Sequence, residues 1–375
     1  MNPLSHHFIE PLDVLFLRGN KLFGDPGSHG ESLVPPWPSV AAGALRSMLL
    51  SADGVDLDAF ARGDVRHPTL GTPAEPGSFR LCGFDLARRG AAGSAESLHA
   101  LPADLVVLRD DAGALQVNRL QPTSPAVGLA SSAPLPQWPV LSQARRDKPV
   151  GGHWLTQAGW AAYLGGATPS AQHLVASTDL WKLDLRIGIG IDAETRSAAD
   201  TQLFTAQAVA MAPGVGFLVA SSGAELPSRA VLRLGGDGRG AELQAVKHTP
   251  CVPDPAKIAQ ARRCRIVLTS PGLFEQGWHF ANSNETRQID LPGIRARLAC
   301  AVVSRPSIVS GWDLARRQPK AAERMAPTGS VFWLDELDTT PEQLRKLVEH
   351  GLWPAGTQNS QRQAEGFNRF SLAPW

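Results

Sequence analysis

Arginine and glycine residues alternate with aliphatic residues along one segment in the middle of the chain, residues 181–191 (WKLDLRIGIGI). Arg186, Gly188 and Gly190 fall on one face of the strand that this alternation predicts, and Arg196 follows just beyond it. A guanidinium group binds phosphate, and a glycine in a strand lets a backbone or a nucleotide approach closely. Two interpretations of this face remain open: a surface that contacts phosphate groups, or a solvated edge of a sheet.

Two short basic runs are further candidates for contact with a polyanion: Arg262, Arg263 and Arg265, and then Arg316, Arg317, Lys320 and Arg324. Lys and Arg attract phosphate electrostatically, although a solvated surface is the commoner role of a single run. The chain also has ten tryptophans, whose rings can stack on bases. For most of these tryptophans we expect packing in the core.

Sequence motifs for catalysis are missing. There is no P-loop, no H-E-x-x-H and no G-x-S-x-G, and Gly188-Ile-Gly190 does not precede a helix as a dinucleotide fingerprint would. The sequence 235–238 (GGDG) is similar to the G-G-D-D turn of polymerase and cyclase palm domains, whose carboxylates bind metal ions. Because its fourth residue supplies no ligand and Asp-Gly favours a tight turn, we predict a β-hairpin there. We expect no metal and no cofactor.

The composition limits the classes of protein that remain. The 375 residues are 43% hydrophobic, which is enough for two or three folded domains. Lys+Arg 36 and Asp+Glu 35 give a net charge of +1, so any polyanion site must be a local patch. The N-terminus lacks the pattern of a signal peptide and no long apolar run exists, so we expect a cytoplasmic protein without a membrane partner. The four scattered cysteines are expected to be buried, reduced thiols.

Strands dominate the elements that must position these residues. They are expected at 8–17, 79–86, 105–108, 181–191, 201–211, 216–220, 231–234, 241–246, 264–269, 298–303 and 331–334. A helix is expected at 40–50 with Ser39 as its N-cap, a short one near 154–163, and another at 341–352 with Thr340 as its N-cap. This pattern predicts an α+β fold of two β-α-β-β-α-β units, with domains at 1–180 and 181–375 and a Pro/Gly/Ser-rich insertion at 120–149.

Several motifs, in order over almost the whole chain, together resemble one family. They are IEPLDVLFxR at 9–18, ESL at 31–33, PPxPS at 35–39, AGALR at 42–46, RIGIGIDxxTR at 186–196 with QLF at 202–204, GWD at 311–313, PK at 319–320 and PxGSV at 327–331. The segment 186–196 is the most specific. The chain resembles the third subunit of the Cmr effector complex, a RAMP protein of type III-B CRISPR systems.

The resemblance implies two ferredoxin-like folds and a non-catalytic subunit that binds RNA. Such a subunit holds the 5′ repeat-derived tag of the crRNA and contacts the large cyclase/polymerase-like subunit and the backbone RAMP subunit. It meets the target RNA only indirectly, and the complex serves antiviral defence. A near-neutral subunit among protein partners needs a basic track rather than an overall positive charge.

The resemblance and the basic residues together give a predicted RNA-binding set: Arg18, Lys21, His29, Arg46, Arg186, Gly188, Gly190, Arg196, Arg316, Arg317, Lys320, Gly366 and Asn368. Arg46 lies on an expected helix, where an ion pair or packing is the alternative. RAMP proteins typically end in a glycine-rich loop, whereas this chain has Gly366-Phe367-Asn368. Asn adopts left-handed backbone more readily than most residues, so the turn can persist.

Three other functions remain open. The chain could be a RAMP endoribonuclease that cuts precursor crRNA, with His29 in its glycine-rich loop as the acid or base. It could be the equivalent tag-holding subunit of a type III-A complex, with the same role and different partners. The third alternative is a protein-only scaffold with no RNA contact.

Overall fold

A computed structural model of the chain describes residues 4–19, 29–126, 128, 130–131, 135–142, 147–192, 194–275, 277–278, 287–354, 356 and 359–375. The chain forms two compact units, and it passes from one to the other after Ala95, Ser177, Lys247, Ile308 and Ala322. Only the crossing after Ser177 lies near the predicted boundary at residue 180. The prediction of two consecutive domains is therefore wrong, because each unit is assembled from three separate stretches of chain.

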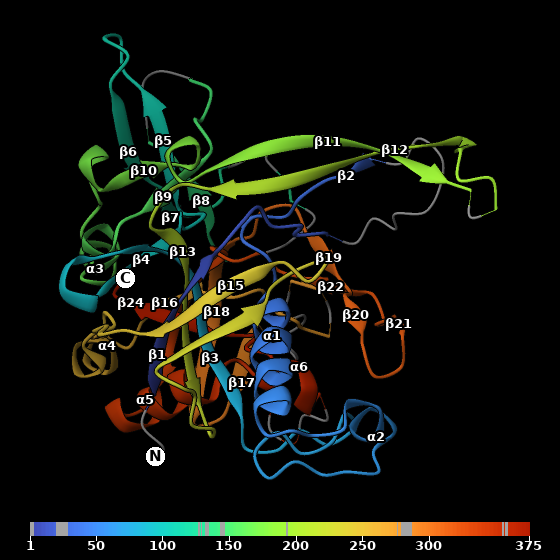
Figure 1. Ribbon diagram of the computed structural model, residues 1–375. Helices are drawn as coiled ribbons and strands as arrows, with labels where there is room; N and C mark the ends of the chain where they lie inside the picture. Colours follow the sequence, from blue (N-terminus) through green and yellow to red (C-terminus); the bar gives the residue numbers. More distant parts are fainter. Residues whose placement is uncertain are drawn as a thin grey trace. The chain divides into compact units, whose positions relative to one another are not determined.

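The first unit is built on an antiparallel sheet with strand order β3-β13-β1-β15-β14 (Figure 1). Its elements are β1 (Ser5–Pro11), α1 (Pro38–Ala52), α2 (Leu57–Arg62), β3 (Arg80–Arg89), the 3-10 turn Ala91–Gly93, β13 (Val215–Ser222), β14 (Arg229–Arg233) and β15 (Gly240–Ala245). Phe8 and Ile9 of the central strand β1 are buried. Helix α1 lies in the crossover from β1 to β3 and packs against β3 and β14.

Helix α1 begins two residues earlier than we predicted. Trp37 is the N-cap, without a side-chain hydrogen bond, and Pro38 is the first helical residue. Ser39 is therefore not the N-cap. Proline fits the first position because its fixed φ suits a helix and its missing N–H would have no partner there.

The glycine-containing segment forms a long hairpin in the first unit. β11 (Trp181–Ile191) pairs with β12 (Ala198–Met211), and β2 (His29–Gly30) pairs in parallel with β12 (Figure 1). The strand 181–191 is confirmed at both ends. Its aliphatic face is exposed, with Ile187 71% and Ile191 68% exposed. The alternation therefore predicted the strand, but not which face the fold buries.

The second unit contains most of the remaining elements. They are β4 (Ala95–Ala100), β5 (Leu105–Arg109), β6 (Leu115–Arg119), β7 (Gln121–Thr123), β8 (Trp138–Val140), β9 (His153–Leu155), α3 (Gln157–Leu164), the 3-10 turn Ala171–His173, β10 (Leu174–Ala176), α4 (Pro255–Ala261), β16 (Cys264–Leu268), β17 (Gln288–Leu291), β18 (Ile294–Val302), β22 (Glu323–Met325), β23 (Val331–Asp338), α5 (Pro341–His350), α6 (Ser360–Ala364) and β24 (Phe370–Ala373). The 3-10 turn Ser177–Asp179 and β19 (Ser307–Val309) lie at crossings between the units.

An antiparallel sheet of order β17-β18-β23-β16-β24 forms the core of the second unit and is buried on both faces. On one face Ile266 and Phe332 pack in the same cluster as Leu344 of α5. On the other face Trp333 packs in the same cluster as Trp160 of α3. Helix α5 has the predicted N-cap, because the hydroxyl of Thr340 accepts a hydrogen bond from the N–H of residue 343 at 3.2 Å.

The predicted β-hairpin at 235–238 is confirmed, and the prediction for the cysteines is confirmed in part. The GGDG sequence turns the chain between β14 and β15, with Asp237 (φ 58°) and Gly238 (φ 61°) in left-handed backbone. All four cysteines are free, but only Cys264 and Cys300 are buried, whereas Cys82 and Cys251 are half-buried. Burial raises the pKa of Cys264 and of Cys300 to about 12. No helix within the described ranges is long and apolar enough to cross a membrane.

Candidate nucleic-acid interface

Two arginines from distant parts of the chain meet around the ring of Phe16 in the first unit. The guanidinium carbon of Arg186 lies 6.0 Å from the centroid of this ring, and that of Arg239 lies 5.1 Å from it. The carbonyl of Phe16 accepts a hydrogen bond from the N–H of Gly236 at 2.8 Å, which holds the GGDG turn beside it. Arg18 reaches the same turn. We call Phe16, Arg18, Arg186 and Arg239 the Phe16 cluster.

Each arginine of the Phe16 cluster has a carboxylate beside it. Arg18 lies 3.6 Å from Asp237, Arg186 lies 2.9 Å from Asp184, and Arg239 lies 3.0 Å from Asp13. The three arginine side chains remain 43%, 44% and 30% exposed. Ion pairs this exposed contribute only about 0–1 kcal/mol each, so they orient the guanidinium groups and leave them able to bind phosphate.

Arg239 is not in the predicted RNA-binding set. It directly follows the GGDG turn, which the sequence did identify as a hairpin. Its position beside Phe16 depends on contact between residues more than 200 positions apart, and no local pattern reports such a contact.

Arg196 lies at the tip of the β11–β12 hairpin. One carboxylate oxygen of Asp192 accepts hydrogen bonds from the N–H of Glu194 (3.1 Å) and from the N–H (2.7 Å) and hydroxyl (2.8 Å) of Thr195. The hydrogen bonds from Thr195 are the largest cause of the lowered pKa of Asp192. Arg196 follows in left-handed backbone (φ 54°) and is exposed. The D-x-x-T-R part of the motif therefore builds a turn that presents a cation.

The two glycines of β11 have different surroundings. A side chain at Gly188 would place its Cβ 2.2 Å from a ring carbon of Phe204, so the phenylalanine ring occupies the space that we predicted for a sugar-phosphate chain. That prediction is corrected, because packing within the hairpin already requires glycine there. Gly190 lies where the pairing with β12 shifts register, between Ile189 and Ile191. A contact between Gly190 and RNA stays a prediction.

A second basic hairpin presents Arg316 and Arg317 together with an exposed tryptophan. It is formed by β20 (Trp312–Asp313) and β21 (Gln318–Pro319). Arg316 and Arg317 are exposed, and Arg317 lies 3.5 Å from Asp58. Trp312 is 55% exposed on the same hairpin, which places a stacking surface close to two cations in the sequence. The GWD motif was the signal for Trp312, although our predicted set omitted it.

The remaining predicted residues of the first unit are spread more widely. Lys320 is half-buried, and its N–H donates to the carbonyl of Gly311 at 2.9 Å. Arg46 lies on α1 with its guanidinium carbon 5.9 Å from the ring centroid of Phe79, which agrees with the packing alternative. Lys21 lies outside the described residues. The backbone of His29 pairs with β12, and its side chain also lies outside the description.

Gly366 and Asn368 belong to the core of the second unit. Asn368 has no exposed surface and adopts left-handed backbone (φ 58°), as predicted for the turn. Its side-chain oxygen accepts from the N–H of Leu273 at 2.5 Å, and its amide donates to the carbonyls of Leu273 (3.2 Å) and Leu352 (3.0 Å). Gly366 is buried beside it. This burial contradicts direct RNA contact by the Asn368 side chain, which instead ties three stretches of chain together.

Arg265 is also part of the core. It is 2% exposed, lies 2.6 Å from Asp104, and has its guanidinium carbon 4.5 Å from the ring centroid of Tyr163. The hydroxyl of Tyr163 donates to Asp104 at 2.8 Å, and burial is the main reason that the pKa of Tyr163 is raised well above its usual value. This tyrosine has no exposed surface. Across the described ranges, no three or more His, Cys, Asp or Glu side chains are grouped to hold a metal ion.

Comparisons with known proteins give one family and several structures. A family model described as "CRISPR-associated protein (Cas_Cmr3)" matches residues 7–375. No curated protein matches the chain. Two similar structures are chains from the type III-B Cmr-beta complex bound to cognate target RNA, one of them also with AMPPnP. The first is 14% identical, with a TM-score of 0.46 and coverage of 97% of this chain and 96% of that one. The second is 14% identical, with a TM-score of 0.48 and coverage of 98% and 99%.

Proposed function

Because the chain belongs to the Cas_Cmr3 family of CRISPR-associated proteins, we propose that it is the crRNA-binding subunit of a type III-B Cmr complex. In this role it holds the 5′ repeat-derived tag of the crRNA. It also bridges the large cyclase/polymerase-like subunit to the backbone RAMP subunits. The tag is single-stranded, so its phosphates need oriented cations and its bases need surfaces for stacking.

The observation that supports the proposal most strongly is the Phe16 cluster with Arg196. The motifs 9–18 and 186–196, far apart in the sequence, meet at Phe16, where their arginines are oriented and partly exposed. Arg196 adds an exposed cation at the tip of the hairpin whose strand β11 carries Arg186. Guanidinium groups held in this way suit a phosphate chain that follows the hairpin.

We also infer a ferredoxin-like core in each unit. In the first unit the strands that follow one another as β1, β3, β13 and β15 lie in the spatial order β3-β13-β1-β15. In the second unit β16, β18, β23 and β24 lie in the order β18-β23-β16-β24. Both orders are those of a β-α-β-β-α-β unit, with α1 and α5 in helix positions of the two units.

We propose that the subunit does not cut RNA. Burial of Tyr163 and its hydrogen bond to Asp104 support this proposal, since a cleaving group must reach the 2′-hydroxyl or the leaving oxygen. The endoribonuclease alternative then rests on His29. Incubation of precursor repeat RNA with the purified chain in EDTA distinguishes the two, because cleavage that disappears in His29→Ala would establish the enzyme.

The RNA-binding proposal is tested by replacing both hairpin arginines. We expect Arg186→Ala/Arg196→Ala to weaken crRNA retention. The slope of log affinity against log salt concentration should also become shallower, by about 0.7 for each phosphate that an arginine no longer neutralises. Arg62→Ala/Arg229→Ala is the matched control, because these exposed arginines of the same unit lie outside the motifs. Binding should be measured by filter retention at several salt concentrations.

The outcome that would contradict this assignment is an affinity and a salt slope equal to those of the control. The role in the complex needs a second experiment, in which a tagged chain is purified with its genomic neighbours and the bound RNA is sequenced. Short RNAs that share one 5′ end support tag holding. The identity of the large subunit that co-purifies distinguishes a type III-B complex from the type III-A alternative. A chain that purifies without RNA indicates a protein-only scaffold.

A further inference from the structure

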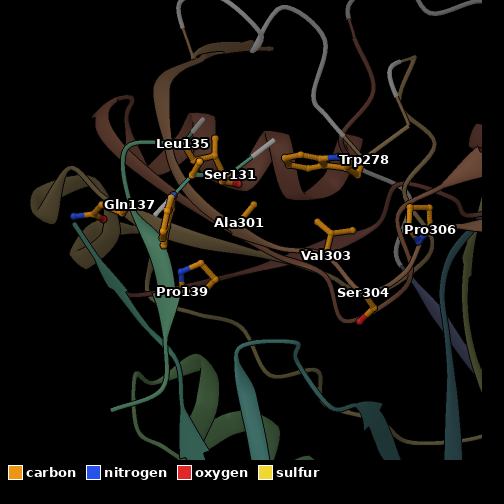
Figure 2. Close-up of a pocket in the computed structure, with 11 residues that line it drawn as sticks. Ser131, Leu135, Gln137, Pro139, Trp278, Ala301, Val303, Ser304 and Pro306 are labelled. Atoms are coloured by element: carbon orange, nitrogen blue, oxygen red, sulfur yellow. The ribbon is translucent and has the colours of Figure 1, made fainter. Parts of the chain in front are cut away.

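A hollow in the second unit has a volume of about 550 Å³ and lies apart from the Phe16 cluster in the sequence. Its lining includes Leu135, Trp138, Trp278, Ala301, Val303 and Ser304. Figure 2 shows Trp278, Ala301 and Val303 around this hollow, with Pro139 on another side of it. The volume falls within the range of about 300–1,000 Å³ that is usual for small-molecule sites.

The walls of the hollow are held by the sheet of the second unit. The N–H of Gln137 donates to the carbonyl of Ala299 at 2.9 Å, which fixes β8 against β18. Trp138 is paired with Thr123 of β7. Leu135 and Trp278 are partly buried against the hydrophobic cluster that includes Phe332. These contacts hold the lining residues in place before any ligand binds.

The chemistry of the lining favours a neutral, planar ligand. Two indole rings and several aliphatic groups line the hollow, with polar groups from Ser131, Ser304 and Gln137, and the described lining includes no charged side chain. Arg305 lies between the lining residues Ser304 and Pro306 and is exposed. A cation is thus next in the sequence to two residues of an uncharged, aromatic lining.

We propose that this hollow binds an unpaired nucleobase of single-stranded RNA, with its phosphate at Arg305. Aromatic rings stack on splayed bases, and nearby hydroxyl and amide groups can bond to base edges. A proline-rich peptide also suits aromatic grooves, but it gives no role to a cation between two lining residues in the sequence. The inference rests on the proposed RNA-binding function and adds a base site in the second unit to the phosphate-binding surface in the first.

The test compares Trp278→Ala, Trp278→Phe and Arg305→Ala in the full-length chain, with fluorescence anisotropy of a labelled single-stranded RNA. We expect Trp278→Ala to lower the affinity by about 5- to 150-fold, the usual range for one stacked base. Its salt slope should stay unchanged, because every phosphate keeps its cation. Trp278→Phe should restore most of the affinity, and Arg305→Ala should lower the slope by about 0.7.

If the Trp278→Ala chain does not fold, a second measurement tests the proposal on the wild-type chain. RNA carrying 4-thiouridine is cross-linked to the wild-type chain, and cross-links to peptides containing Trp138 or Trp278 support the proposal. Cross-links found only in the first unit overturn it. It is also overturned if a folded Trp278→Ala chain binds RNA with wild-type affinity while Arg186→Ala/Arg196→Ala still weakens binding. The hollow is assigned to a protein partner, and the proposal fails, if a proline-rich peptide binds saturably and Trp278→Ala abolishes that binding without changing the affinity for RNA. Failure of the wild-type chain to bind or cross-link to RNA contradicts both proposals.

Discussion

Asn368 shows how a residue at a motif position can serve the fold. The glycine-rich loop of RAMP proteins led us to predict RNA contact, but the Asn368 side chain is fully buried. Its hydrogen bonds to Leu273 and Leu352 satisfy backbone groups that would otherwise be buried without partners. The asparagine therefore supplies both the left-handed backbone and the hydrogen bonds that a glycine would lack.

We expect Asn368→Gly to reduce the free energy of unfolding by about 1–3 kcal/mol, because buried backbone groups lose their partners while the backbone keeps its conformation. Asn368→Ala should reduce it by about 1–2 kcal/mol more, because alanine is strained at positive φ. Urea unfolding followed by circular dichroism measures both changes. An unfolding midpoint for Asn368→Gly equal to that of the wild type would show that these hydrogen bonds contribute nothing.

Among the elements, the β11–β12 hairpin requires glycine at position 188, because a side chain there would clash with the partner strand β12. Phe204 lies opposite Gly188 in the register, and its ring covers the glycine. The same strand carries Arg186, two residues earlier, into the Phe16 cluster. Packing inside the hairpin therefore supports the position of a predicted RNA-binding group.

Gly188→Ala should displace the Phe204 ring and reduce hydrogen-exchange protection of the hairpin amides. Adding Phe204→Ala should restore part of that protection, because the clash is removed. Gly43→Ala is the matched control, since a Cβ there meets nothing within 4 Å and alanine favours the helix. If Gly188→Ala protects the hairpin amides as well as Gly43→Ala does, the packing argument is incorrect.

For the whole molecule, the interleaving of the two units determines what can fold alone. Strand β1 lies between β13 and β15, which come more than 200 residues later in the chain. A cut at residue 180 therefore removes the central strand of the first sheet from its neighbours. The same arrangement brings the motifs 9–18 and 186–196 to one surface.

We expect fragment 1–180, expressed alone, to show no cooperative thermal unfolding transition. It lacks β13, β14 and β15 of the sheet of the first unit and all five strands of the core sheet of the second unit, and exposed sheet edges favour aggregation. Differential scanning calorimetry of this fragment beside the full-length chain provides the measurement. Cooperative unfolding of fragment 1–180 would mean that its strands pair differently from those described.

The sequence by itself determined the local features of this protein. Alternation defined β11, Asp-Gly defined the β14–β15 turn, and Thr340 with Pro341 defined the start of α5, because each depends on neighbouring residues and backbone preference. The family motifs also predicted the family that the match over residues 7–375 confirms. These signals come from neighbouring residues, or from short sequence motifs that occur in a fixed order along the chain.

Only the tertiary structure decided which of the predicted RNA-binding residues share a surface and which are buried. It placed Arg239 beside Phe16, covered Gly188 with Phe204, buried Arg265 and Asn368, and divided the chain five times between two units. Each outcome depends on contacts between residues distant in the chain, or on which face of a strand finds an apolar partner. Charge and spacing look the same in the sequence for a surface arginine and for a buried one that has found a carboxylate.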